Sequence, residues 1–240
     1  PVGEIVGSAL WLTVLVNLAA VVFVYAVALP LGVLAAAKSE TWVDYSAGFV
    51  GYLGLATPNF LLALILFYYG NKYFNLPIGG LMDPALEGEP MSWEKVKSIL
   101  LHLIVPTFVI GTSGAAAMMQ RLRANMLDEL SKPYVETARA KGMAPARLLA
   151  KYPLRMAFNP FVADIGNLLP AMVSGSVLVS VVLGLQTIGP SLLTALKSQD
   201  QFLAAFILMF VALLTLIGTM ISDLLLVLLD PRIRYGGRDT

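Results

Sequence analysis

Ser113 and His102 are the residue types of a serine hydrolase, so their spacing decides whether they could act together. Ser113 lies in the small-residue run Gly111-Thr112-Ser113-Gly114, and a nucleophilic serine needs a basic partner within hydrogen-bond reach. His102, the one histidine of the chain, precedes Ser113 by 11 residues in one apolar stretch, about 16 Å along a helix. An intramembrane protease is therefore disfavoured, and the run predicts a close helix crossing.

Two carboxylates, Asp164 and Asp223, lie inside apolar stretches of the chain. Ionisable side chains within a membrane are expensive and often mark a proton or cation pathway. Both aspartates lie near the ends of their stretches, and Asp164 follows Arg155 by about two helical turns. Two interpretations remain open. One is an interfacial or buried carboxylate paired with an arginine, and the other is a relay in an ATP-independent secondary transporter or channel.

The sequence excludes several other kinds of site. The chain contains 0 Cys, so it has no disulfide framework, no thiolate metal site and no cysteine nucleophile. No G-x-x-x-x-G-K-[ST] motif is present, so the chain has no P-loop for ATP. The net charge of +1 gives no indication of nucleic-acid binding. We expect no cofactor, no metal and no covalent catalysis on this chain.

The composition predicts a membrane protein. Of 240 residues, 58% are hydrophobic and 13% are charged, whereas soluble domains carry about 25% charged residues. A helix that crosses the bilayer needs about 20 mainly apolar residues. We expect one all-α transmembrane domain over residues 1–240, a multi-pass helical bundle. Five stretches are long enough to be spans: about 8–37, 45–69, 98–119, 158–182 and 202–229.

The basic residues predict the orientation of these spans. Twelve of the 16 Lys and Arg residues fall in the 38–44 link, the 120–157 loop and the C-terminal tail. Lys and Arg are enriched on the cytoplasmic side of membrane proteins. The C-terminus is therefore expected in the cytoplasm and the N-terminus outside. Because the chain begins with Pro1 and lacks a signal peptide, we expect a further span upstream.

The 120–157 loop contains signals for two short helices. Ser131 is the expected cap of a first helix, with Pro133 in its first turn. Gly142 stands where a left-handed C-terminal residue is needed. Pro145 is expected to open a second helix that ends at Pro153. On pattern alone, a basic loop at the membrane surface is an equally good interpretation.

A resemblance distinguishes between these interpretations. Glu136-Thr137-Ala138, three further residues and Gly142 resemble the EAA loop (E-A-A-x-x-x-G) of ABC importer permeases. The wider string YVETARAKGMAPARLLAKYPLRMAFNP is similar to the dipeptide, oligopeptide and nickel branch of that family. The ending Asp230-Pro231-Arg232-Ile233-Arg234-Tyr235 and the segment Pro58-Asn59-Phe60 also resemble those permeases.

The resemblance implies the type I importer (MetI-like) permease fold, with the usual N-terminal span absent here. It implies a subunit in a prokaryotic inner membrane that forms the pathway for a small solute. The implied partners are a second, related permease, two ATPase subunits that carry ATP and Mg²⁺, and an external solute-binding protein. The residues implied to couple to the ATPases are Tyr134, Val135, Glu136, Thr137, Ala138, Arg139, Lys141, Gly142 and Met143.

Within that loop we expect small side chains to let a helix sit close in a groove, and Tyr134, Val135 and Met143 to form an apolar contact patch. Candidate pathway or gate residues are Ser180, Gln186, Pro58 and Asn59. In the peptide branch a glutamate typically stands at the position of Ser180. That departure leaves peptides and oligosaccharides both open as cargo.

Overall fold

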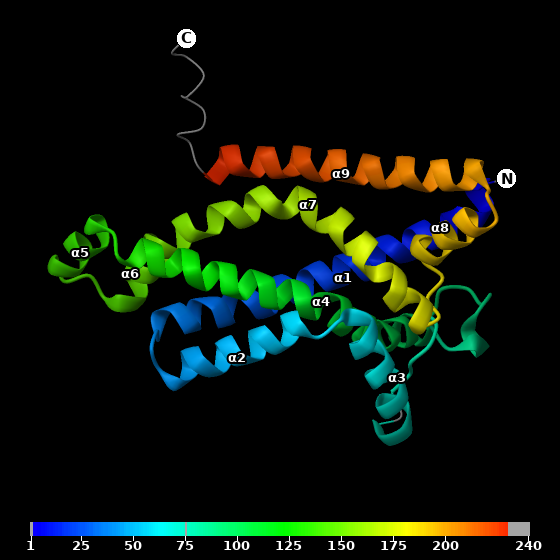
Figure 1. Ribbon diagram of the computed structural model, residues 1–240, viewed down its shortest axis with the longest axis horizontal. Helices are drawn as coiled ribbons and strands as arrows, with labels where there is room; N and C mark the ends of the chain where they lie inside the picture. The colour runs from blue at the N-terminus through cyan, green and yellow to red at the C-terminus, as the bar shows by residue number, and fades with distance from the viewer. Residues whose placement is uncertain (1, 75, 230–240) are drawn as a thin grey trace, which may run out of the picture. The chain divides into compact units, whose positions relative to one another are not determined.

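The computed structural model describes residues 2–74 and 76–229, apart from the side chains of residues 2–5, 160 and 163–174. The described backbone is helical and contains no strand, as the composition predicted. Figure 1 labels the α-helices, which are α1 (Val2–Ala37), α2 (Trp42–Ala56), α3 (Asn59–Phe74), α4 (Trp93–Leu130), α5 (Pro133–Ala140), α6 (Pro145–Lys151), α7 (Pro153–Val182), α8 (Ile188–Lys197) and α9 (Gln201–Leu229). A short 3-10 helix, η1 (Pro84–Leu86), lies between α3 and α4 in the sequence.

Among the described residues, three helices are long and apolar enough to cross a membrane: α1, α4 and α9. The expected span 45–69 is instead two helices, α2 and α3, separated at Thr57-Pro58; together they form one bent candidate span. Pro58 lacks an N–H donor and disfavours helical geometry at the residue before it, which explains the break. The expected span 158–182 lies within α7, but many of its side chains are outside the described residues.

Helix α4 is longer than expected from the sequence. It continues from Trp93 to Leu130, about 57 Å at 1.5 Å per residue. The stretch after Gln120, expected to belong to the loop, consists mostly of strong helix formers such as Arg, Leu, Met, Ala and Glu. The connection between α4 and α7 therefore starts only at Ser131, and most of it is the two short helices α5 and α6.

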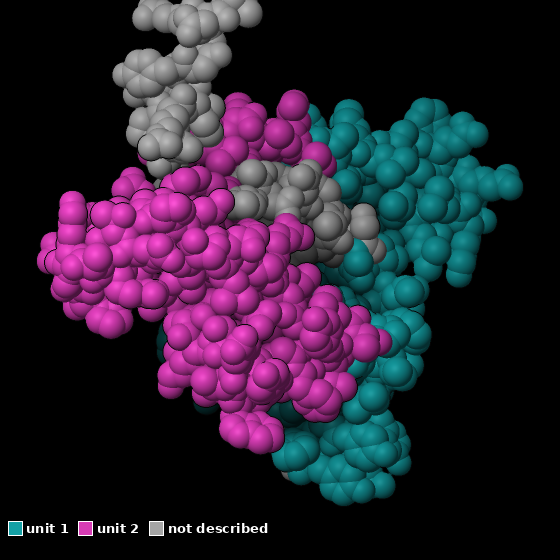
Figure 2. All heavy atoms as spheres, turned by 60° about the vertical axis from the view of Figure 1, so that its left-hand side comes forward, with its two compact units in different colours: residues 1–23, 57–113, 169–214 teal, residues 24–56, 114–168, 215–240 magenta. Residues whose placement is uncertain are grey.

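The chain divides into two compact units (Figure 2). Unit 1 comprises residues 1–23, 57–113 and 169–214, and unit 2 comprises residues 24–56, 114–168 and 215–240. Helices α1, α4, α7 and α9 each contribute residues to both units.

In unit 1, the first half of α1 packs against α8 and α9 through Val6, Ala9, Ile188 and Ile207. Gly111 of α4 fits against Phe23 of α1, because a Cβ at residue 111 would lie 2.5 Å from the Phe23 ring. The small-residue run around Ser113 thus contains a close helix contact, as predicted. His102 and Ser113 lie on the same continuous helix, so the protease geometry does not form.

In unit 2, glycines allow α1 and α2 to approach α4. A Cβ at Gly32 of α1 would lie 3.1 Å from Leu122, and one at Gly51 of α2 would lie 2.5 Å from Met119. Leu122 itself is fully buried. Close backbone approach through small residues is the usual basis of helix association in lipid, where apolar burial supplies little driving force.

Candidate functional site

The α5–α6 element, residues 131–152, is the candidate coupling site. Helix α5 begins at Pro133, whose fixed φ suits the first helical position. The cap residue is Lys132, which makes no side-chain cap hydrogen bond. Ser131 is therefore not the cap, contrary to the prediction; its hydroxyl donates to the Asp128 carbonyl at 2.8 Å, closing the end of α4.

Gly142 ends α5 in the left-handed conformation, with φ +74°, as predicted. The Met143 N–H donates to the Ala138 carbonyl at 3.3 Å, and the Gly142 N–H donates to the Arg139 carbonyl at 3.0 Å. This pair of bonds is a Schellman motif, which satisfies carbonyls at the helix end. It also turns the chain directly into α6, which starts at Pro145.

Helices α5 and α6 pack on one another through a small apolar cluster of Val135, Ala138 and Leu148. Leu130, Met143 and Tyr152 cover its edges. Val135 is fully buried, so it does not belong to an exposed contact patch as predicted. The reason is periodicity: residues 135 and 138 share one face of α5, and α6 already occupies that face.

The outward face of the α5–α6 element is polar and contains most of the predicted coupling residues. Tyr134 is 39% exposed and is the apolar part of this face. The other exposed members are Glu136, Thr137, Arg139, Ala140, Lys141 and Gly142. The face therefore combines both signs of charge with small side chains. It is available to a partner, whereas the buried face holds the element together.

Tyr134 also connects α5 back to the end of α4. Its hydroxyl donates to the Glu129 carboxylate, and its ring lies 5.9 Å from that of Tyr152. Partial burial, followed by the hydrogen bond and the charge of Glu129, raises the pKa of Tyr134 to about 12. The phenol is therefore neutral at physiological pH and acts as a hydrogen-bond donor.

A partly buried ion pair joins α4 to α2, about two turns before this element. The Arg123 guanidinium donates to both carboxylate oxygens of Asp44 in α2, at 2.5 and 2.7 Å. Asp44 is only 3% exposed, and it also accepts from the Glu40 N–H at 3.0 Å. Gln120 adds a hydrogen bond to the Gly48 carbonyl at 3.3 Å. These contacts fix the start of α2 against α4.

This ion pair was not predicted from the sequence. Asp44 and Arg123 are 79 residues apart, and neither belongs to a recognisable motif. The available signal was weak: an acid at the start of an apolar stretch needs a partner if it is buried.

Ser180, predicted to line a pathway or gate, is instead inside unit 1. Its side chain is completely buried and accepts a hydrogen bond from Thr187 at 2.9 Å. The next residue, Ile188, donates its N–H to the Thr13 hydroxyl of α1 at 2.9 Å. Thr13 in turn donates to the Ala9 carbonyl at 2.6 Å. Within this unit Ser180 therefore stabilises the turn between α7 and α8.

The other predicted pathway residues are exposed to different degrees. Gln186 is exposed and lines a pocket of unit 1 together with Glu87 and Trp11. Pro58 is exposed, and its carbonyl accepts from the N–H groups of Leu61 and Leu62, so it opens α3. Asn59 is the first residue of α3 and is half-buried. These residues do not form one cluster with Ser180 in the described contacts.

The two intramembrane carboxylates differ in what the structure describes. The side chain of Asp164 lies outside the described residues. Asp223 is exposed on α9, an otherwise apolar helix, and thus faces the surroundings of this chain. Asp223 is therefore not buried, and the interfacial position that was also expected for it stays a prediction. The motif at residues 230–235 also lies outside the described residues.

Comparisons with known proteins agree with this architecture. Residues 28–235 match the family described as "Binding-protein-dependent transport system inner membrane component". The chain is 32% identical to the oligopeptide transport system permease protein AppB of Bacillus subtilis, over 98% of this chain and 73% of that protein. It is 28% identical to the dipeptide transport system permease protein DppB of Escherichia coli, over 93% of this chain and 70% of that protein.

A solved structure shares the fold. The structure titled "Inward facing conformations of the MetNI methionine ABC transporter" has a chain with a TM-score of 0.72, at 14% identity. The alignment covers 95% of this chain and 97% of that one. At this identity the similarity shows the fold alone, and it confirms the expected MetI-like helical fold.

Proposed function

This chain belongs to the family of inner membrane components of binding-protein-dependent transport systems, the permease subunits of ABC importers. We propose that it forms part of the translocation pathway for short peptides in an ATP-driven importer. The proposed cargo rests on the names of the relatives, which are oligopeptide and dipeptide permeases. Oligosaccharide cargo has no corresponding support, so peptides are the preferred class.

The proposed complex contains a second, related permease, two ATPase subunits that bind ATP and Mg²⁺, and an external solute-binding protein. The α5–α6 element is proposed to lie in the cytoplasm and to dock on an ATPase subunit. The positively charged side of the chain, which includes this element and the C-terminal tail, supports that orientation. The permease itself carries out no covalent step.

The single observation that carries the coupling proposal is the construction of the α5–α6 element. Its apolar residues are used internally, around Val135, and its outward face is left polar and exposed. Because the glycine turn at residue 142 and the prolines at residues 133 and 145 define its backbone, the element can move as one piece. A rigid projection of this kind is what transmits the movement of an ATPase to membrane helices.

Two connections lead from the element into the membrane-spanning helices. It follows α4 directly, and α6 continues after Tyr152 into α7. The Asp44–Arg123 ion pair joins α4 to α2, so a displacement of α4 would also move the start of α2. We propose that closure of the ATPase pair on ATP shifts the element and, through these helices, opens the pathway alternately to each side.

The ATP-independent alternative depended on Asp164 and Asp223 acting as a relay. Asp223 is exposed on α9, and nothing described connects it to a second titratable group. This observation gives the relay no support, and the permease proposal is preferred.

Co-purification tests the proposal. The full-length protein is expressed with its genetic neighbours, isolated by a tag on this chain, and assayed for ATPase activity in lipid. We expect ATPase subunits to co-purify, and Glu136→Lys to release them by reversing a charge on the outward face of α5. Glu40→Lys makes the same charge change at an exposed residue between α1 and α2 and should retain them.

A chain that purifies alone and transports a peptide into liposomes without ATP would contradict the proposal. Equal retention of the ATPases by Glu136→Lys and Glu40→Lys would remove the assignment of the α5–α6 element while leaving the family assignment intact.

A further inference from the structure

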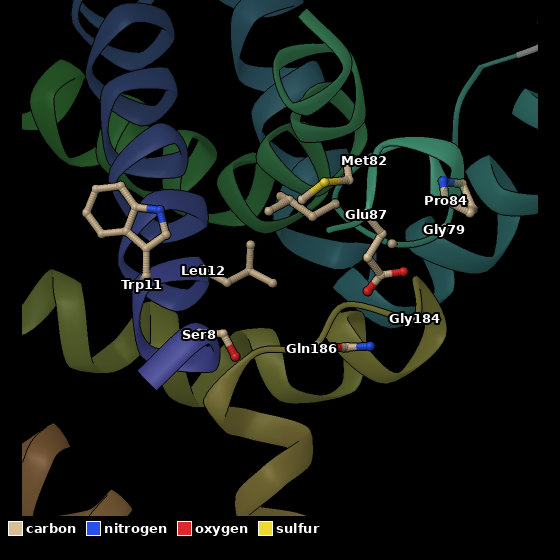
Figure 3. A pocket seen from close by; sticks show the side chains of 11 residues that line it. Ser8, Trp11, Leu12, Gly79, Met82, Pro84, Glu87, Gly184 and Gln186 are labelled. Carbon is tan, nitrogen blue, oxygen red and sulfur yellow. The ribbon is translucent and has the colours of Figure 1, made fainter. Parts of the chain in front are cut away.

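A pocket of unit 1 has the features of a small-molecule site. It has a volume of about 400 Å³, within the range of ligand pockets. Three segments that are far apart in the sequence form it: Ser8–Leu12 of α1, the loop of residues 79–87, and the turn between α7 and α8. Figure 3 shows the side chains of Ser8, Trp11, Glu87 and Gln186 around this pocket.

The walls of the pocket are held in place by backbone contacts. The Gly80 N–H donates to the Leu183 carbonyl at 3.1 Å, which joins the loop to the end of α7. Gly80 and Gly184 both have a positive φ, at +74° and +63°. A Cβ at Gly184 would lie 3.8 Å from the Gly80 nitrogen, so the two segments approach closely at glycines.

The loop also has its own internal bonds. Asp83 accepts from the Ala85 N–H at 3.0 Å and donates its N–H to the Ser98 hydroxyl at 2.9 Å. Lys95 donates to the Glu89 carbonyl at 2.6 Å. The backbone on both sides of Glu87 is therefore fixed, and the carboxylate is presented from an ordered loop.

The chemistry of the lining favours a cation. Glu87 is the one acidic or basic side chain among the described lining residues, so the pocket carries a negative charge that no lysine or arginine of its lining neutralises. Trp11 is 68% exposed and lines the end of the pocket opposite Glu87 (Figure 3). The Gln186 amide and Ser8 hydroxyl oxygens can accept hydrogen bonds, and Leu12 and Met82 supply apolar surface.

We propose that this pocket binds the ammonium group of a short peptide as it passes through the transporter. The inference rests on the proposed function and extends it, because it names the end of the peptide that is recognised. Glu87 pairs with the ammonium and the neighbouring Gln186 accepts a hydrogen bond from it, while Trp11 lines the opposite end of the pocket (Figure 3). A lysine of a docked solute-binding protein has the same ammonium chemistry, and the test separates the two sources.

The experiment uses the assembled transporter in lipid nanodiscs, without the solute-binding protein. Binding of radiolabelled dialanine is compared with that of N-acetyl-dialanine, which lacks the charged amine. We expect dialanine to bind and the acetylated peptide not to bind. Glu87→Gln should weaken dialanine binding by about fivefold, which corresponds to about 1 kcal/mol for a solvent-accessible ion pair.

Glu94→Gln is the matched control, since Glu94 is an exposed acid on the first turn of α4 that does not line the pocket. It should bind dialanine like the unmodified chain. Gln186→Leu should weaken dialanine binding by about threefold through loss of the hydrogen bond to the ammonium. Equal melting temperatures for the variants would show that the effects are not due to unfolding.

Three results would overturn the proposal: no binding of dialanine to the unmodified transporter, equal binding of the acetylated peptide, or unchanged binding by Glu87→Gln. If Glu87→Gln instead loses only the ATPase stimulation caused by the solute-binding protein, the carboxylate contacts that protein and the peptide site is wrong. Co-purification of the ATPases with Glu87→Gln would show that the proposed function stands in either case.

Discussion

Helices α5 and α7 end with the same backbone motif in very different surroundings. Each closes with a left-handed glycine, Gly142 or Gly184. The N–H groups of this glycine and of the residue after it donate the two hydrogen bonds of a Schellman motif. A Cβ added at Gly142 would have nothing within 4 Å, whereas the Gly80 backbone lies beside Gly184. The local sequence signal is therefore the same, and the tertiary contacts differ.

The contrast distinguishes a movable element from a fixed one. The α5–α6 element packs on itself and on the end of α4 through Leu130. The turn between α7 and α8 is bound to the 79–87 loop through Gly80 and to α1 through Thr13. We infer that the first region changes position as a unit, and that the second forms a stable wall for the pocket.

The largest expected effect concerns the ion pair that positions α4. Arg123→Met leaves the buried Asp44 carboxylate without its charged partner, which should destabilise unit 2 by about 3 kcal/mol. Thermal unfolding in detergent measures this loss. The double variant Asp44→Asn, Arg123→Met removes the buried charge and should recover most of the stability; a double variant as unstable as the single one would contradict this account.

A smaller loss is expected at the fixed turn. Gly184→Val places a β-branched residue at φ +63°, at a cost of about 2 kcal/mol, and the bonds to neighbouring segments prevent relaxation. The melting temperature should fall, and dialanine binding should weaken because the pocket wall shifts. Unchanged binding together with a lower melting temperature would show that the turn does not shape the pocket.

Gly142→Val should cost less, about 1 kcal/mol, because the left-handed strain at φ +74° remains but the added Cβ meets no neighbouring atom. Its main effect should be on the coupling of ATP hydrolysis to peptide uptake. We expect the complex to remain assembled and ATP to be hydrolysed, with peptide uptake strongly reduced. The ratio of peptide taken up to ATP hydrolysed measures this. A ratio equal to that of the unmodified transporter would show that the direction of the turn is unimportant.

The smallest effect is expected in the neutral hydrogen bonds of unit 1. Ser180→Ala removes the acceptor of the Thr187 hydroxyl and leaves that buried group unpaired, at about 1 kcal/mol. Adding Thr187→Val removes the unpaired hydroxyl and should restore most of the loss. Transport by Ser180→Ala should be nearly normal. A strong transport defect without loss of stability would instead support the sequence-based prediction that Ser180 lines the pathway.

Features that depend on local chemistry were predictable from the sequence. Composition predicted membrane helices, Gly142 predicted the left-handed end of α5, and the prolines at residues 133 and 145 predicted two helix starts. The same local reasoning placed Val135 on the outside, because nothing in the chain order shows that Leu148 covers it. Exposure within a helical hairpin depends on which face meets its partner, and that is a tertiary property.

The missed residues are those whose partners are distant in sequence. Asp44 with Arg123, Ile188 with Thr13, and Glu87 with Gln186 acquire their roles only when separate segments of the chain meet. The break at Pro58 was predictable as a kink, but whether the span continues as one helix depends on packing on either side. Periodicity and composition carry no information about these long-range contacts.

Because the chain contains 0 Cys, single cysteines can be introduced directly, and cross-linking is the most direct test of the coupling proposal. A thiol-reactive photo-cross-linker is attached at Arg139→Cys, on the outward face of α5, in the assembled transporter. Lys72→Cys, on the exposed surface of α3, is the control. The account predicts a cross-link from position 139 to an ATPase subunit and none from position 72. A cross-link from position 72 alone, or none from position 139, would contradict the assignment of the α5–α6 element as the ATPase contact.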